Sequence, residues 1–363
     1  MGWASRRGRV PSAKASVTGS GAKRGALPVV GQLGVAGALG AFAALGAVGA
    51  LAGCAAPGAP PPRPIAEPPL TFRGMPAPPD AKLDPPGQPA ESAFVDGAPD
   101  WVGSVPPGSE EQRDGAHMRR IKERGRVIVG VDQSQYLLSY RDVKEGDLRG
   151  FEVDLAREIA ADIFGNPGQV DFRFVESAAR AESLRSGEVD MVIRTMSITP
   201  ERTELVDFST PYLTSAVRVL ATRDRGIGGA DDLAGKTVCI VDGTNLLNLV
   251  RARMPESEVL RTRSWSDCLM ALQQFQADAI VGDDAVLAGM VAQDPLTQVF
   301  PDKLANQLYA IGVAKGHDDV VRQVNFTVER IRDNGTWDRI YDQWLGNSIT
   351  ESWLPDPMYR DDA

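Results

Sequence analysis

The chain has 363 residues, of which 43% are hydrophobic, so it can form more than one ordinary domain with a sizeable core. Its formal net charge is −9, and without the six basic residues of positions 1–53, a stretch that carries no acid, the remainder carries −15. Such an acidic body argues against a nucleic-acid-binding surface. The only histidines, His117 and His317, have no cysteine or histidine at metal-ligand spacing. We therefore expect no nucleic acid, no metal and no other cofactor.

Residues 1–53 have the order of a secretory signal sequence. A basic start is followed by the uncharged run Gly25–Gly53, which ends in LAGC at Leu51–Cys54. This ending resembles the lipobox of bacterial lipoproteins, which implies that Cys54 is acylated and anchors the protein to the outer face of the cell membrane. An uncleaved membrane-spanning helix is the alternative. The arginine pair in SRRGRV (Ser5–Val10) leaves the Sec and twin-arginine export routes both open.

The next segment is rich in proline. Sixteen of the 26 prolines fall between Pro57 and Pro107. Proline fixes φ and removes backbone donors, so residues 54–117 are predicted to form a disordered, semi-extended spacer. Its simplest role is to hold a folded domain away from the membrane, and a proline-rich ligand for a partner module is the alternative.

From Met118 onward, strand and helix patterns alternate. RVIVGVD (Arg126–Asp132) is a buried-strand run, and Phe151–Phe164 places its apolar residues on one helical face. QVDFRFV (Gln169–Val175) alternates like a strand, and a helix end, Gly187 and a further strand follow. These patterns predict an α/β fold with parallel strands and binding groups at the strand ends.

Six motifs follow one another in this region. They are GFEVDLAREIA (Gly150–Ala160), LRSGEVDMVI (Leu184–Ile193), SITPERTELVDFSTPY (Ser197–Tyr212), DDLAGKTVCIVDGT (Asp231–Thr244), ADAIVGDD (Ala277–Asp284) and RDNGTWDRIYDQWLG (Arg332–Gly346). Together they resemble the family-3 extracellular solute-binding proteins of polar amino acid ABC importers, of the glutamate- and glutamine-binding type. The resemblance implies a type II periplasmic-binding-protein fold, in which two α/β lobes are joined by two crossing strands.

The resemblance also implies domain boundaries. It gives lobe 1 (118–220 and 311–348) and lobe 2 (221–310), which follow the signal peptide (1–53) and the spacer (54–117) and precede a C-terminal tail (349–363). The chain is then expected to cross between the lobes near Val217–Arg223 and to return near Leu308–Val313.

The stretch ITPERTEL contains a helix start. Thr199 can cap the helix and Pro200 suits its first position, so helix initiation explains much of this motif. Capping does not explain why the preceding strand also delivers Arg194, Thr195 and Ser197 to the same corner. These groups point to a ligand site.

A free amino acid would satisfy such a site. The planar fork of Arg202 can bind both oxygens of a carboxylate, and Ser197 adds a donor. The resemblance implies that Arg202 and Ser197 hold the α-carboxylate of the ligand and that Asp283 of lobe 2 accepts its ammonium group. The adjacent Asp284 is an alternative acceptor.

The ligand side chain is expected to meet two further groups. DGTNLLNLV places Thr244 and Asn245 at a helix start, where free N–H groups favour an oxygen ligand. The resemblance marks Thr244 as a contact position. Arg194 and Arg180 supply additional cations that favour glutamate or aspartate, with glutamine and asparagine as the next candidates, and both arginines could instead be exposed charges.

An aromatic side chain over the ligand stem is usual in this family. Here Gln135 stands where a ring is often found, and Tyr136 follows it. Tyr136 is therefore the candidate lid, with a core position as the alternative.

Cys239 and Cys268 lie in a predicted strand and a predicted helix of lobe 2, 29 positions apart. Outside the cytoplasm these elements could bring the two sulfurs together as a disulfide, and two buried free thiols are the alternative. No histidine lies near either cysteine in sequence, so a catalytic cysteine is not expected.

These features together predict a monomeric, lipid-anchored binding protein without catalytic residues. It would enclose a small polar amino acid between its lobes and present the closed form to an ABC permease. The first alternative is a sensor that presents the ligand to a membrane signalling protein. The second is an enzyme similar to cyclohexadienyl dehydratase, which would need an acid–base group at the reacting carbon.

Overall fold

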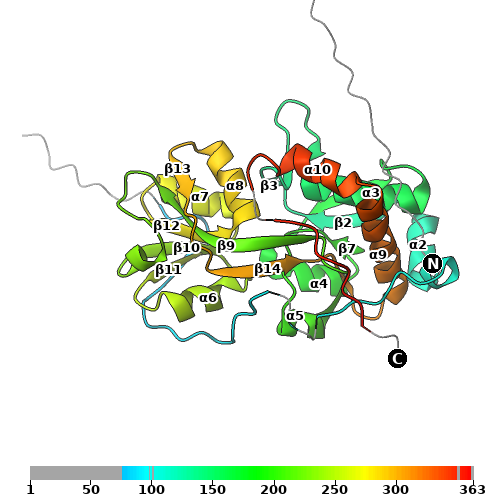
Figure 1. Ribbon diagram of the computed structural model, residues 1–363, viewed down its shortest axis with the longest axis horizontal. Helices are drawn as coiled ribbons and strands as arrows, with labels where there is room; N and C mark the ends of the chain where they lie inside the picture. The colour runs from blue at the N-terminus through cyan, green and yellow to red at the C-terminus, as the bar shows by residue number, and fades with distance from the viewer. Residues whose placement is uncertain (1–75, 98, 100–101, 350–351, 361–363) are drawn as a thin grey trace, which may run out of the picture. The chain divides into compact units, whose positions relative to one another are not determined.

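The computed structural model describes residues 76–97, 99, 102–349 and 352–360 (Figure 1). They belong to one compact unit of the chain. The predicted signal sequence, Cys54 and the first part of the predicted spacer lie outside the described residues. Among the helices that the structure describes, none is both long enough and apolar enough to cross a membrane.

One lobe is built on a five-stranded sheet with the order β6-β2-β7-β15-β8. Its strands are β2 (Val127–Val131), β6 (Val170–Phe174), β7 (Met191–Val192), β8 (Val206–Phe208) and β15 (Gly312–Ala314). β2 runs parallel to β6 and β7, whereas β15 runs antiparallel to β7 and β8. All five residues of β2 are buried, as expected for a central parallel strand covered on both faces.

Helices surround this sheet. They are α1 (Glu110–Arg113), α2 (Ala116–Arg124), α3 (Phe151–Phe164), α4 (Arg180–Arg185), α5 (Pro200–Leu205), α9 (Asp318–Asp333) and α10 (Thr336–Trp344), with the 3-10 turn η1 (Ser177–Ala179) before α4. α9 packs against α2, α3 and α10. The bounds of α3 are those predicted from its apolar periodicity.

The other lobe is built on a seven-stranded sheet with the order β1-β11-β10-β12-β9-β13, in which β14 also pairs with β9. Its strands are β1 (Lys82–Asp84), β9 (Leu213–Thr222), β10 (Thr237–Val241), β11 (Glu258–Thr262), β12 (Ala279–Asp283), β13 (Thr297–Val299) and β14 (Ala305–Tyr309). Its helical segments are η2 (Ala230–Leu233), α6 (Leu246–Arg253), α7 (Trp265–Gln273) and α8 (Asp284–Gln293).

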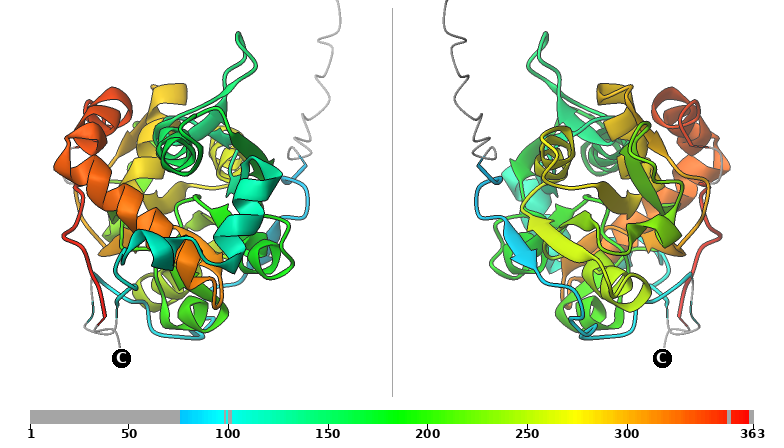
Figure 2. Two further views of the ribbon diagram at one scale, coloured as in Figure 1. Left: turned by 90° about the vertical axis from the view of Figure 1, so that its right-hand side faces the viewer. Right: turned by 90° about the vertical axis from the view of Figure 1, so that its left-hand side faces the viewer.

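A small third sheet projects beyond the five-stranded lobe. It consists of β3 (Ser134–Gln135), β4 (Ser139–Arg141) and β5 (Leu148–Arg149), which pair in that order. Figure 2 shows the loop between β4 and β5 standing clear of the neighbouring elements. Val143 in this loop is almost fully exposed.

The position predicted for the first lobe crossing is wrong. The residues of Val217–Arg223 lie in or directly after β9, which pairs with β12, β13 and β14 over its whole length. The chain passes from one sheet to the other earlier, between Phe208 and Leu213. The return, between β14 and β15, lies within its predicted range. Periodicity did not reveal the error because β9 is a continuous buried run whichever lobe it belongs to.

The predicted spacer is also too long, because its last part is folded against the lobes. β1 pairs antiparallel with β11 and occupies the short proline-free stretch between Pro79 and Pro85. A three-residue edge strand needs few backbone donors, so the flanking prolines do not prevent it. Later in the same region, Ser109 forms a capping box with Gln112 at the start of α1. In the described part of the predicted spacer, the disorder expected from the high proline content is therefore wrong.

Cys239 on β10 and Cys268 on α7 form a disulfide within the seven-stranded lobe. Their sulfurs lie 1.99 Å apart and their Cα atoms 5.7 Å apart. β10 and α7 pack directly on each other, so the bond links two layers of the same α/β lobe.

Replacing both cysteines by serine is expected to lower the free energy of unfolding by roughly 3–4 kcal/mol, because the cross-link closes a loop of 29 residues. Denaturant unfolding would measure the loss. Reduced wild-type protein serves as the matched control and should lose a similar amount. A full loss in the double variant with no effect of reduction would assign the loss to packing of the serines instead.

Candidate functional site

Polar and charged side chains gather where the two lobes face each other. From the five-stranded lobe they come from the ends of β2 and β7 and from α3, α4 and α5; from the other lobe they come from β12, β14 and the turn before α6. They include Asp132, Glu152, Arg180, Arg194, Arg202, Asn245, Asp283, Gln307 and Tyr309.

Arg202 is held at the start of α5 by the predicted cap. The side chain of Thr199 accepts a hydrogen bond from the Arg202 backbone N–H at 3.3 Å, and Pro200 occupies the first turn. The half-buried guanidinium donates to the carbonyl of Ser197 at 2.7 Å and to the carbonyl of Gly243 at 3.1 Å. Ser197 and Gly243 belong to different lobes, so Arg202 bridges the gap between them.

Arg180 makes the same bridge from a more deeply buried position. Its Nε donates to the Ser177 carbonyl at 2.8 Å, and Nη1 donates to the carbonyls of Arg194 and Thr195 at 3.2 and 3.3 Å. Its Nη2 donates to the Gly243 carbonyl at 3.2 Å. Two guanidinium groups therefore share one carbonyl oxygen of the opposite lobe.

These two arginines form a positive cluster without a direct counter-charge. Within the described residues, all their hydrogen-bond acceptors are backbone carbonyls, and neither guanidinium has a carboxylate within ion-pair distance. Burial lowers the pKa of Arg180, and the nearby charges of Arg202 and Arg194 lower it further. Burial also lowers the pKa of Arg202 to about 10, although Asp283 acts in the opposite direction. An anion bound here would stabilise the charged forms of both guanidinium groups.

Gly243 is required where the lobes meet. Its φ is +75°, and a Cβ at this position would lie 2.5 Å from the Cα of Ala178. On the far side of the contact, a Cβ on Gly289 of α8 would collide with the carbonyl oxygen of Tyr136. Arg263 and Glu176 add a cross-lobe ion pair. The structure therefore has closely apposed lobes.

Asp283 lies at the carboxyl end of β12 and is buried. Its Oδ1 accepts a hydrogen bond from Gln307 at 2.6 Å, and its Oδ2 accepts one from the Tyr309 hydroxyl at 2.5 Å. Burial raises the pKa of Asp283 to about 7, and the adjacent Asp284 raises it as well, while its hydrogen bonds and Arg202 lower it. The carboxyl group of Asp283 can therefore gain or lose its proton near neutral pH.

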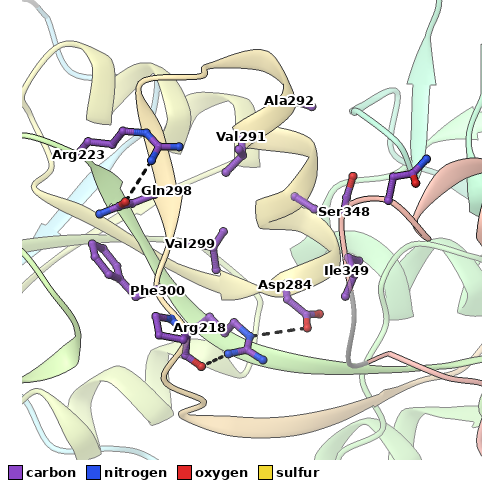
Figure 3. Close-up of a pocket in the computed structure, with 13 residues that line it drawn as sticks. Arg218, Arg223, Asp284, Val291, Ala292, Gln298, Val299, Phe300, Ser348 and Ile349 are labelled. Carbon is purple, nitrogen blue, oxygen red and sulfur yellow. Dashed lines mark hydrogen bonds and ion pairs between the residues drawn. The ribbon is translucent and has the colours of Figure 1, made fainter.

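Asp284 faces a different cavity. Its Oδ1 accepts hydrogen bonds from the Ser215 hydroxyl at 2.6 Å and the Ala216 N–H at 3.2 Å, and its Oδ2 lies 3.9 Å from Arg218. It lines a cavity of about 690 Å³ with Arg218 and Ile349, shown in Figure 3. The two neighbouring acids therefore have different surroundings: Asp284 lines this cavity, and the pKa of Asp283 is lowered by the charge of Arg202.

Arg194 is fully buried and already has a counter-ion. Its Nη2 lies 2.5 Å from Asp132 Oδ2, and its Nη1 donates to the Ser177 hydroxyl. Its Nε has no hydrogen-bond partner among the described residues. Sequence reasoning did not single out Asp132, although it ends the first strand of the α/β pattern, where binding groups collect.

Thr195 takes part through its backbone. It has a positive φ of 41°, and its N–H donates to Glu152 Oε1 at 2.6 Å. The hydroxyl of Tyr212 donates to the same oxygen at 2.6 Å, and burial raises the pKa of Glu152. Glu152 Oε2 has no partner in the described part of the chain. Sequence reasoning missed Glu152 because a glutamate in the first turn of a helix reads as a favourable surface charge.

The remaining predicted contacts differ in what they offer a ligand. Ser197 is buried, and its backbone bridges to Tyr309. The Thr244 hydroxyl donates to the Val241 carbonyl at 2.7 Å, which fixes the turn before α6. Asn245 donates to Gln307 Oε1 at 3.0 Å, so it is linked to Asp283 through one side chain.

Tyr136 packs on another ring instead of on the arginines. Its ring centroid lies 4.7 Å from that of Tyr140, and the residue lines a small crevice with Trp265 and Leu269 of α7. The neighbouring Gln135 is buried, and within the described residues neither atom of its amide has a hydrogen-bond partner. These contacts favour packing for Tyr136 and make Gln135 a better candidate for a ligand contact.

Comparison with known proteins gives a family match for this chain. A model described as bacterial extracellular solute-binding proteins, family 3, matches residues 127–347. The chain is 29% identical over 232 residues to the ABC transporter glutamine-binding protein GlnH of Bacillus subtilis. The aligned residues cover 64% of this chain and 85% of that protein.

Solved structures agree with this assignment. A solute receptor for L-cysteine from Neisseria gonorrhoeae has a TM-score of 0.61 and 28% identity, covering 64% of this chain and 97% of its own. An ancestral amino-acid-binding protein, a precursor of cyclohexadienyl dehydratase, has a TM-score of 0.59 and 27% identity, covering 63% and 100%. The predicted type II periplasmic-binding-protein fold is confirmed.

Proposed function

The chain belongs to the bacterial extracellular solute-binding proteins of family 3, and we propose that it captures a dicarboxylic amino acid, glutamate or aspartate, between its lobes. The coarser function is amino-acid binding within the ABC transporter family.

The observation that supports an acidic ligand is the unpaired arginine cluster. Arg202 and Arg180 bring two positive charges to the gap with no carboxylate partner among the described residues, while Asp283 faces Arg202 from the other lobe. A dicarboxylic amino acid carries two carboxylates and one ammonium, which matches this distribution of charge. We assign the α-carboxylate to Arg202 and Ser197, and the ammonium to Asp283.

We assign the side-chain carboxylate to Arg180, because Arg194 is fully buried and already paired with Asp132. A guanidinium bound only to carbonyl oxygens gains more from a carboxylate, because the opposite charges attract and the carboxylate can accept two parallel N–H bonds. Asn245, at the start of α6, would contribute to this end of the ligand through its backbone N–H, and Thr244, whose N–H donates to the Val241 carbonyl at 3.3 Å, would shape the turn beside it. Glutamine would lose the second ionic contact.

The capture mechanism follows from the division of these groups between the lobes. Ligand contacts on both sides stabilise the closed form relative to an open one, and only this difference in affinity can shift the population. We propose that Cys54 carries a lipid anchor and that an ABC permease recognises the closed form of a monomer. A membrane signalling protein is the alternative partner.

Calorimetry with each of the twenty amino acids would test the proposed function. Glutamate or aspartate should bind most tightly. No heat of binding with any amino acid would refute the proposal. Turnover of prephenate or arogenate would instead support a dehydratase. One structural neighbour is a precursor of cyclohexadienyl dehydratase.

Replacing Arg180 by methionine should weaken glutamate more than glutamine. The expected difference is about 1.5–3 kcal/mol, roughly tenfold or more in Kd, because one hydrogen-bonded ionic contact is lost only for the charged ligand. Arg185→Met is a matched control, since Arg185 lies on the same helix with its side chain 73% exposed. Equal losses for both ligands would remove Arg180 from side-chain recognition.

A further inference from the structure

A segment outside the family match lies along the seven-stranded lobe. We call residues 82–97 the strap. It begins with β1, which pairs with β11, and it precedes the first matched residue, 127. In Figure 1 it continues from β1 past α6 toward α5.

Side chains fasten the strap to α6. Asn248 accepts a hydrogen bond from the Glu91 N–H at 3.0 Å and donates to the Ser92 hydroxyl at 2.8 Å. Arg251 forms ion pairs with Asp84 at 2.8 Å and with Glu91 at 3.0 Å. The pair with Asp84 is shielded from water, with side chains 8% and 17% exposed, whereas Glu91 is 78% exposed.

The far end of the strap is attached to β14. The backbone N–H of Asn306 donates to Asp96 at 2.7 Å, and the Gly97 N–H donates to the Asn306 carbonyl at 3.0 Å. β14 also carries Gln307 and Tyr309, the two partners of Asp283. The strap therefore joins α6 and β14, two elements that border the lobe gap.

Between these attachments the strap borders an open chamber of about 410 Å³. Its walls are strap residues 91–95, the start of α5 with Thr199 and Arg202, and the turn before α6 with Thr244 and Asn245. Two of these residues, Arg202 and Asn245, are proposed ligand contacts. Glu201 on α5 also lines this chamber, so the strap faces both lobes.

We propose that the strap forms a third wall of the amino-acid site, covering the Arg202 side of the lobe gap and slowing release of the ligand. The proposal rests on the proposed function. A two-lobed site holds its ligand with walls from the lobes alone, and here residues 91–95, which precede the family match, add a wall beside Arg202. A ligand that leaves past Arg202 would move along this wall.

Release of the strap would test this role. In full-length protein, Asp84→Ala combined with Asn248→Ala removes anchors on both sides of Glu91 without changing a proposed ligand contact. Stopped-flow tryptophan fluorescence with L-glutamate should then show dissociation faster by roughly tenfold or more, since lost contacts act mainly on the off-rate. Leu83→Ala is the control, because this strap side chain is 56% exposed and does not line the chamber.

A second variant tests the same wall in the opposite sense. Ala93→Trp places a large ring in the chamber and should slow L-glutamate association while leaving the melting temperature of the free protein unchanged. If wild-type protein binds L-glutamate and neither variant changes a rate constant relative to Leu83→Ala, the strap is no part of the site. If wild-type protein binds no amino acid, the proposed function fails, and this inference fails with it.

Discussion

Arg202→Ala should abolish measurable binding of every amino acid. The guanidinium is the predicted partner of the α-carboxylate, which all amino acids share, so the loss should not depend on the ligand side chain. Removing one partner of a buried, hydrogen-bonded charge pair costs about 2–5 kcal/mol, or roughly 30-fold to several thousand-fold in Kd. Arg202 also links Ser197 to Gly243 across the lobe gap, so its removal weakens the closed form itself. Calorimetry with glutamate and glutamine would measure both losses.

Two controls separate these contributions. Arg202→Lys keeps the positive charge but loses the planar fork, and it should bind more weakly than wild type and more tightly than Arg202→Ala. Arg185→Ala removes an exposed arginine whose only ion-pair partner in the described part of the chain is Glu182 on its own helix, and it should bind normally. Unchanged affinity in Arg202→Ala would exclude Arg202 from the site and refute the assigned binding mode.

Local patterns predicted the elements that depend on local physics. The periodicity of Phe151–Phe164 gave a helix with the observed bounds, and Thr199 and Pro200 start α5 as expected. The positions of Cys239 and Cys268 in a strand and a helix of one lobe also allowed their pairing to be considered. Each of these features depends on neighbours in sequence or on one adjacent layer.

Features that depend on distant partners were not accessible in this way. Arg194 was considered as a ligand contact or an exposed charge, yet it is a buried partner of Asp132, 62 positions earlier. Glu152 reads as a helix-start acid until the fold places Thr195 and Tyr212 around it. No local pattern specifies which charge will meet which after the chain has folded.

The strap shows the same limit for composition. Prolines argue against a packed core, and that argument is sound for the interior of a domain. It does not apply to a segment that lies on a core built by other residues and needs only a short edge ladder and a few side-chain anchors. Lys82–Asp84 and Asn248 supply these. The sequence match begins after the strap, so resemblance could not reveal it either.

Glutamate affinity should fall as pH decreases below about 7, and Asp283→Asn should remove this dependence. The ammonium group of the ligand needs an ionised Asp283, whereas burial raises the pKa of this carboxyl to about 7 in the free protein. Binding below that pH must displace a proton, so Kd should rise about tenfold for each pH unit. Above pH 7 the affinity should be nearly constant. Calorimetry between pH 5.5 and 8 would follow the change.

The same carboxyl should affect the stability of the free protein with the opposite sign. Its pKa in the folded state lies above the ordinary aspartate value of 3.8, so the folded state binds the proton more tightly than the unfolded state does. This contribution to stability is complete at low pH and is lost as pH rises toward about 7. The melting temperature of the free protein should therefore gain from Asp283→Asn at pH 8 and change less at pH 5.5.

Asp284 provides the matched control because it is adjacent in sequence and faces the other cavity. Its charge raises the pKa of Asp283, so Asp284→Asn should keep the pH dependence of glutamate binding but move its break to lower pH. Loss of the dependence in Asp284→Asn together with its persistence in Asp283→Asn would assign the ammonium to Asp284. A shifted break in Asp284→Asn and a flat profile in Asp283→Asn would place the ammonium at Asp283. Only replacing the carboxyl that loses its proton when the ligand binds can abolish the pH dependence.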